Sequence, residues 1–140
     1  MKRLCFLALF CTLGCSGNYL TVHQERIDRE FLASSHVGTP DPRQKDPAKG
    51  QRLIVSWDFP LSLYRQDITL LLTVRFWDTT EESRRFSINH KRGLKTFFFK
   101  NQDDLVGKKL LTYRVDALSA KGETLSVWEH QLWCKPIVVD

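Results

Sequence analysis

The chain has 140 residues, enough for one ordinary domain with attached segments. Its composition, 42% hydrophobic and 26% charged, is typical of a globular protein and excludes a wholly disordered one. The formal net charge of +5 includes Lys2 and Arg3, and the other basic residues are interspersed with acidic ones. We therefore expect no nucleic-acid partner, because that function requires a basic patch or stripe.

The first 14 residues have the pattern of an export signal. Lys2 and Arg3 give a positive start, and residues 4–13 form an apolar run. A run of about ten residues is too short to cross a membrane, which takes roughly 20. A positive start, a short apolar run and small residues at 14–17 together predict a signal peptide.

Residues 12–15, Thr12-Leu13-Gly14-Cys15, resemble the lipobox of bacterial lipoproteins. The resemblance implies that a diacylglycerol is attached to the Cys15 thiol, that the leader is cut between Gly14 and Cys15, and that the new amino group is acylated. Membrane lipid would then be a partner of the chain, through Cys15. The alternative is an ordinary signal peptide, cut near Gly14 or Gly17.

The same resemblance implies a place in the cell envelope. The mature chain would be lipid-anchored in the cell membrane or the outer membrane, on the periplasmic side or exposed at the surface. Ser16 follows the cysteine where an Asp would retain a Gram-negative lipoprotein in the inner membrane, so the resemblance favours the outer membrane.

Residues 15–50 are expected to form the lipidated N-terminus and a tether. Within it, Ile27 and Phe31 are four residues apart and suit one face of a short helix, although the stretch 18–35 suits an early edge strand equally. Prolines at 40, 42 and 47 predict a loop or linker before Gly50.

Beyond residue 50 apolar and polar residues alternate, which predicts β-strands with one buried face. The first strand contains Leu53, Val55, Trp57 and Phe59 and is stopped by Pro60. Further strands are expected at 68–77, 85–89, 94–99, 109–118 and 124–133. In the last one the alternation changes phase, which predicts a bulge near Val127 and Trp128. Residues 51–140 are therefore expected to form one all-β domain, an antiparallel sandwich of six to seven strands.

Two motifs in this region resemble the fibronectin type III and immunoglobulin-like domains. One is Val55-Ser56-Trp57-Asp58-Phe59-Pro60, and the other is Tyr113-Arg114-Val115-Asp116-Ala117 followed by Gly122 in a hairpin. The resemblance implies that Trp57 packs in the core and that Tyr113 closes a corner by hydrogen-bonding back to the preceding loop. It also implies structural roles for the other matching positions: Pro60, Leu105, Val115, Ala117 and Gly122.

One thiol, Cys134, would remain in the mature chain beside the lipidated Cys15. Free cysteines are usually small buried residues, and this is the first interpretation. The alternative is a disulfide to another envelope protein, because an odd cysteine in an exported chain can pair between molecules.

The residues indicate no catalytic, metal or cofactor site. The four histidines have no neighbour at zinc-ligand spacing. Ser34-Ser35-His36 is not a catalytic arrangement, because a proline-rich linker cannot hold the geometry of a triad, and Cys134 is not in a pattern typical of nucleophilic catalysis. No glycine-rich loop leads from a strand into a helix, so nucleotide binding has no support. We therefore expect no enzymatic activity, no metal and no cofactor.

Aromatic residues out of phase with the predicted core are the best functional indication. They are Trp77, Phe98 and one of Trp128 or Trp133. An exposed aromatic cluster marks a protein-binding surface, unless the tether folds back over it. We expect a membrane-anchored, non-catalytic interaction module with an envelope protein as its partner. The alternative is a structural or accessory subunit of an envelope assembly, joined through Cys134.

Overall fold

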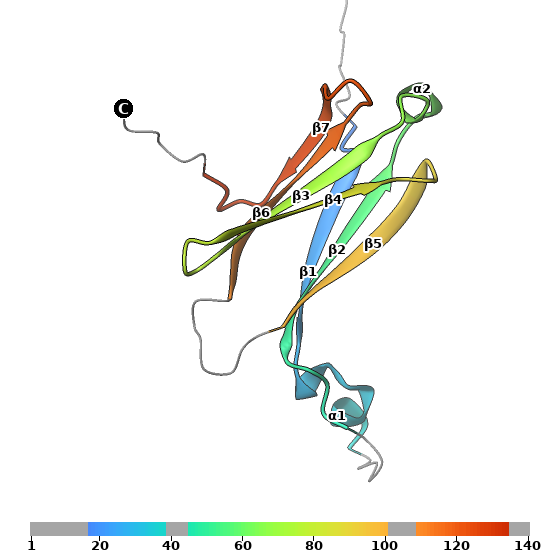
Figure 1. The fold of residues 1–140 in the computed structure, drawn as a ribbon. Helices are drawn as coiled ribbons and strands as arrows, with labels where there is room; N and C mark the ends of the chain where they lie inside the picture. The colour runs from blue at the N-terminus through green and yellow to red at the C-terminus, as the bar shows by residue number, and fades with distance from the viewer. Residues whose placement is uncertain (1–16, 39–44, 101–108, 135–140) are drawn as a thin grey trace, which may run out of the picture.

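The computed structural model describes residues 17–38, 45–100 and 109–134. These residues form two antiparallel sheets, one of three strands in the order β1-β2-β5 and one of four in the order β4-β3-β6-β7 (Figure 1). The strands are β1 (Leu20–Ile27), β2 (Gly50–Asp58), β3 (Thr69–Phe76), β4 (Glu81–Ser87), β5 (Arg92–Lys100), β6 (Leu110–Leu118) and β7 (Thr124–Glu129). Three short helices accompany them: η1 (Arg29–Phe31), α1 (Ala33–Val37) and α2 (Leu61–Tyr64).

The two sheets pack face to face over one core, so the prediction of an all-β antiparallel sandwich with six to seven strands is confirmed. The chain passes from β2 in one sheet to β3 in the other, returns with β5, and crosses again to β6. Alternate residues of each long strand enter the core, as period-two patterning requires. The largest fully buried side chains are those of Leu20, Leu53, Val55, Phe59, Ile68, Leu70, Leu72, Val74 and Val115.

The sandwich begins well before residue 51. Strand β1 pairs along the whole of β2, from Leu20 opposite Trp57 to Ile27 opposite Gly50. The predicted tether of residues 15–50 therefore contains a strand of the domain, and the predicted boundary between Gly50 and residue 51 falls inside the sheet. Of the two alternatives for this stretch, the edge strand is correct for Ile27, whereas Phe31 lies in η1.

The later elements differ from the prediction in detail. Strand β4 begins at Glu81, so the turn before it is shorter than expected, and β7 ends at Glu129 rather than at Trp133. A register shift does occur in the last pair, but between Ala117 and Leu118 of β6. The predicted bulge therefore lies about two residues earlier along β7 than Val127.

Pro60 and Gly122 lie at the turns where the sequence predicts them. Pro60 is the N-cap residue of α2, which begins shortly after the end of β2. Gly122 has a φ of 82° in the turn between β6 and β7, a conformation that favours glycine. The amide of Gly122 donates to the carbonyl oxygen of Ser119 at 2.9 Å and closes that turn.

Candidate binding surface

An apolar patch lies on the outer face of the three-stranded sheet, around Gly50. We define this apolar patch as Ile27, Phe31, Gly50, Arg52 and Phe98. Ile27 is paired with Gly50, and Phe98 is paired with Arg52 on the neighbouring strand. Phe31 is 47% exposed and Phe98 is 40% exposed, so two aromatic rings face solvent on this part of the sheet.

Gly50 is required for the position of Phe98. A Cβ atom at Gly50 would lie 2.6 Å from Cζ of Phe98 and 2.5 Å from the carbonyl oxygen of Phe99. Both distances are shorter than real Cβ contacts. The absence of a side chain at Gly50 therefore lets the Phe98 ring lie over β2.

Arg52 supplies the charged part of the apolar patch. Its guanidinium carbon is 5.1 Å from the centroid of the Phe31 ring, within the range of a cation–π interaction. Its Nε donates to the Glu25 carboxylate at 2.8 Å, which holds the guanidinium in place. Aromatic rings beside an oriented arginine are the combination enriched in protein interfaces.

A shallow groove lies on the same outer face, toward the other end of the sheet. It has a volume of about 470 Å³ and is lined by residues of all three strands, among them Thr21, Ser56 and Leu94. Leu94 is 66% exposed at its margin. The Arg92 guanidinium hydrogen-bonds to Asp58 at this margin, which lowers the pKa of Asp58 and raises the pKa of Arg92.

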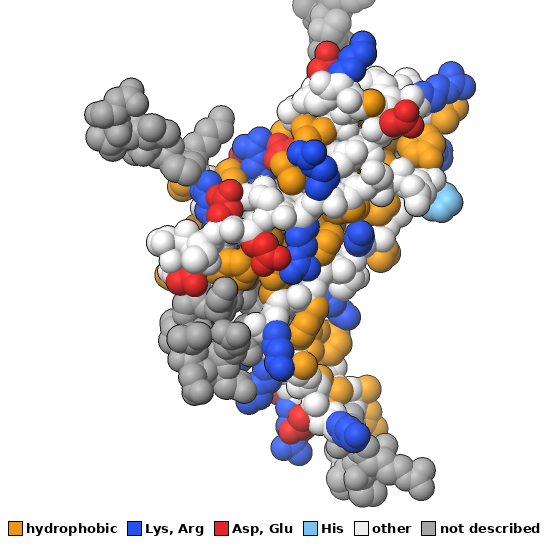
Figure 2. Space-filling view, viewed as in Figure 1, with side chains coloured by type: hydrophobic (Ala, Val, Ile, Leu, Met, Phe, Trp, Pro, Cys, Tyr) orange, Lys and Arg blue, Asp and Glu red, His pale blue; other side chains and the backbone are white. Residues whose placement is uncertain are grey.

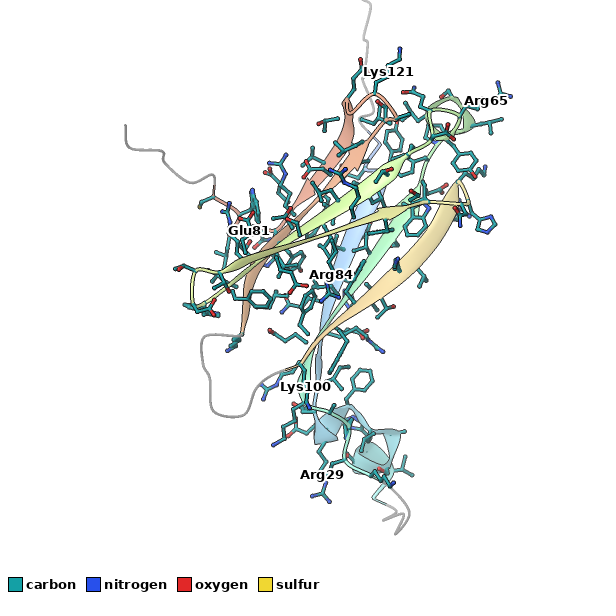
Figure 3. All side chains as sticks on the ribbon, viewed as in Figure 1. Arg29, Arg65, Glu81, Arg84, Lys100 and Lys121 are labelled. Atoms are coloured by element: carbon teal, nitrogen blue, oxygen red, sulfur yellow. The ribbon has the colours of Figure 1, made fainter. Side chains whose placement is uncertain are left out.

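The open side of the sandwich, between β4 and β5, is covered by basic side chains. The Lys95 ammonium is 4.6 Å from the centroid of Phe86, and the Arg84 guanidinium is 5.0 Å from that of Phe99. Figure 2 shows basic side chains over apolar ones along this side, and Figure 3 labels Arg84 between the two strands. These cations cover the margin of the core. They also place charge on the edge strands β4 and β5, which disfavours pairing with another chain.

The four candidates for the predicted surface cluster, Trp77, Phe98 and one of Trp128 or Trp133, are not brought together. Trp77 is 57% exposed and follows β3 of the four-stranded sheet, whereas Phe98 lies on the three-stranded sheet. Trp133 is half-buried, and the Arg75 guanidinium lies 4.1 Å from its ring centroid. Of the four, only Phe98 belongs to the apolar patch.

Of the two alternatives Trp128 and Trp133, Trp128 is partly buried and packs against the core. It is paired with Val115, whose side chain is in the core. Its ring stacks on Tyr113, with centroids 5.4 Å apart and an angle of 9° between the planes. The bulge before Ser126 shifts the phase of β7 and turns Trp128 inward, because one extra residue reverses the facing of those beyond it.

Four of the residues to which the resemblance assigns structural roles are buried. Trp57, Tyr113, Val115 and Ala117 are buried in the core. Burial raises the pKa of Tyr113. Leu105 and the corner loop lie outside the described residues, and so do Gly14 and Cys15.

Cys134 is exposed and is not in a disulfide, so its interpretation as a buried core residue is wrong. It follows β7 after a short turn, and its carbonyl oxygen accepts a hydrogen bond from Arg75. The thiol is therefore accessible to another molecule.

Sequence reasoning missed most of the apolar patch. Phe31 and Arg52 meet only because β1 and β2 pair, and β1 was not assigned. Leu94 was detectable, because it has the same phase as Phe98 and the opposite phase to the buried Phe97. The described residues contain no group of three or more His, Cys, Asp or Glu side chains that could hold a metal ion.

None of the helices in residues 17–38, 45–100 and 109–134 is long and apolar enough to span a membrane. Comparisons with protein-family models, with curated proteins and with solved structures found no match.

Proposed function

We propose that this chain is a bacterial lipoprotein that displays a non-catalytic β-sandwich as an interaction module in the cell envelope. The observation that carries the proposal is the position of Cys15, directly after Gly14 at the end of a positive and then apolar leader. Each buried CH₂ of an acyl chain contributes about 0.8 kcal/mol, and two or more chains anchor a protein stably. The lipid would anchor the domain to the cell membrane or the outer membrane, on the periplasmic side or exposed at the surface.

The outer face of the three-stranded sheet supports an interaction role over a catalytic one. It combines two exposed rings, Phe31 and Phe98, with an arginine held by Glu25. Such a surface offers apolar area and an oriented charge to a protein partner. We propose the apolar patch as the surface that an envelope protein contacts.

Membrane fractionation of cells that express the full chain tests the anchor. The native chain and a Cys15→Ala variant are compared, with Cys134→Ser as a matched cysteine control. We expect the native chain and Cys134→Ser in the membrane fraction and Cys15→Ala outside it. Retention of Cys15→Ala in the membrane at the native level would contradict the proposal.

A second candidate function is that of an accessory subunit joined covalently to an envelope assembly. The exposed Cys134 thiol, free of any disulfide in the described structure, favours it. Non-reducing gel electrophoresis of whole cells distinguishes the two. A larger species that disappears in Cys134→Ser supports the linked subunit, and a monomer band alone in the native cells contradicts it.

A further inference from the structure

The distance along the chain from Cys15 to the folded domain is short. Tyr19 is held in place, because its carbonyl oxygen accepts a hydrogen bond from the amide of Asp58 at 2.9 Å and its ring packs 5.8 Å from that of Phe59. An extended chain covers at most about 3.6 Å per residue, so the four steps from Cys15 to Tyr19 span at most about 14 Å. A lipid on Cys15 would therefore hold this end of the sandwich close to the bilayer.

Several elements meet at the end where β1 begins, which we call the α2 end. The Tyr64 hydroxyl of α2 donates to the carbonyl oxygen of Asn89 in the turn before β5, at 2.7 Å. The amide of Ala120, in the β6–β7 hairpin, donates to the carbonyl oxygen of Gln66, just after α2, at 3.1 Å. Figure 1 shows the start of β1, α2 and this hairpin at one end of the sandwich.

The α2 end carries exposed basic and apolar side chains, together with two exposed acidic ones, Asp67 and Glu123. Arg65, Lys91 and Lys121 are exposed and have no ion pair among the described residues. Leu61, in the first turn of α2, is 54% exposed. Figure 3 labels Arg65 and Lys121 on neighbouring loops of this end. Acidic headgroups attract Lys and Arg side chains close to the membrane surface, and an apolar side chain among them suits the interfacial region.

We infer that the α2 end of the sandwich rests on the lipid bilayer, with Arg65, Lys91 and Lys121 against acidic headgroups. This inference rests on the proposed lipid at Cys15. Strand β1 leads away from the membrane, and its seven steps from Leu20 to Ile27 at about 3.3 Å each span about 23 Å. The apolar patch around Ile27 therefore lies about 23 Å from the α2 end, where a partner in the envelope can reach it.

Fluorescence resonance energy transfer from the protein to the membrane surface tests the orientation of the sandwich. The full lipidated protein is purified in a Cys134→Ser background and placed in vesicles that contain phosphatidylglycerol and a headgroup-linked acceptor dye. A donor dye is attached at Ala120→Cys, in the hairpin of the α2 end, or at Val37→Cys, in α1. We expect transfer from position 120 to be at least threefold higher than from position 37. Equal or reversed transfer would overturn the inference.

Charge reversal tests the contact with headgroups. A triple variant, Arg65→Glu with Lys91→Glu and Lys121→Glu, should lower transfer from position 120 at least twofold. The matched control is Lys45→Glu with Lys49→Glu and Lys100→Glu, which reverses three exposed lysines near the start of β2 and the end of β5. This control should leave energy transfer from position 120 unchanged. Equal transfer in the native chain and the first triple variant would overturn the headgroup contact.

Mass spectrometry of the purified protein distinguishes a failure of this inference from a failure of the proposed function. If Cys15 carries no lipid, both proposals are overturned together. If Cys15 is lipidated and the two dye positions give equal transfer, the orientation alone is overturned and the lipoprotein proposal stands.

Discussion

The indole Nε1 of Trp57 donates a hydrogen bond to the carbonyl oxygen of His90 at 2.9 Å. Trp57 lies near the end of β2, and His90 lies in the turn that leads into β5. The bond therefore ties a core side chain to the turn that also carries Lys91. The same turn meets Phe59, whose amide donates to the Lys91 carbonyl oxygen at 2.8 Å.

Replacing Trp57 separates its packing role from its hydrogen bond. Trp57→Phe removes the indole donor and should lower the free energy of unfolding by about 1–3 kcal/mol, because the His90 carbonyl loses its partner. Trp57→Ala also leaves a cavity and should cost about 3–5 kcal/mol. Urea unfolding followed by circular dichroism measures both values. Equal stability of the native chain and Trp57→Phe would contradict the role of the bond.

Gly50→Ala should disturb the apolar patch directly. The new methyl group would collide with the Phe99 carbonyl oxygen, a backbone atom that cannot move without shifting β5. We expect a loss of about 1–3 kcal/mol in the free energy of unfolding, the usual cost of overpacking. Urea unfolding measures it, and a change below about 0.5 kcal/mol, which is typical of an unconstrained surface position, would contradict the close approach.

Lys95→Val should promote self-association. Lys95 points inward from the edge strand β5, and inward charges on edge strands prevent pairing with another chain. We expect the variant to show a concentration-dependent increase in average mass in sedimentation experiments. Thr96→Val is the matched control, on the same strand but on the outer face, and should sediment like the native chain. An unchanged mass for Lys95→Val would contradict a protective role.

Tyr113 should make the fold sensitive to alkaline pH. Burial raises its pKa, so the folded chain keeps the phenol proton at pH values where the unfolded chain, with a pKa of about 10, loses it. Above about pH 10 the unfolded state binds fewer protons than the folded state, and the free energy of unfolding falls as pH rises. Tyr113→Phe should reduce this slope and have no such effect below about pH 9. Equal slopes for the two proteins in urea unfolding at high pH would contradict the prediction.

The long central strands were predictable because burial on one face leaves a clear period of two. Leu53, Val55 and Trp57 alternate with partly exposed residues in β2, and all three are buried. In β1 only Leu20 and Val22 mark the buried face, because Gln24 occupies the next inward position. An edge strand with two apolar positions cannot be told from a tether by periodicity alone.

The candidate surface was predictable only in part, because it depends on pairing between distant segments. Phe98 could be identified from its phase, but its neighbours Phe31 and Arg52 are 67 and 46 positions away in the sequence. The facing of Trp128 is not predictable from the sequence, because the bulge before Ser126 reverses its phase and the sequence does not fix where a bulge lies.

The proposed membrane anchor depends most on the chemical state of Cys15, and mass spectrometry of the mature protein from its native cells tests this state directly. We expect an N-terminal peptide that begins at Cys15 and carries a diacylglycerol on the thiol with a further acyl chain on the amino group. A mature chain that begins at another residue, or at Cys15 with a free thiol, would contradict the account.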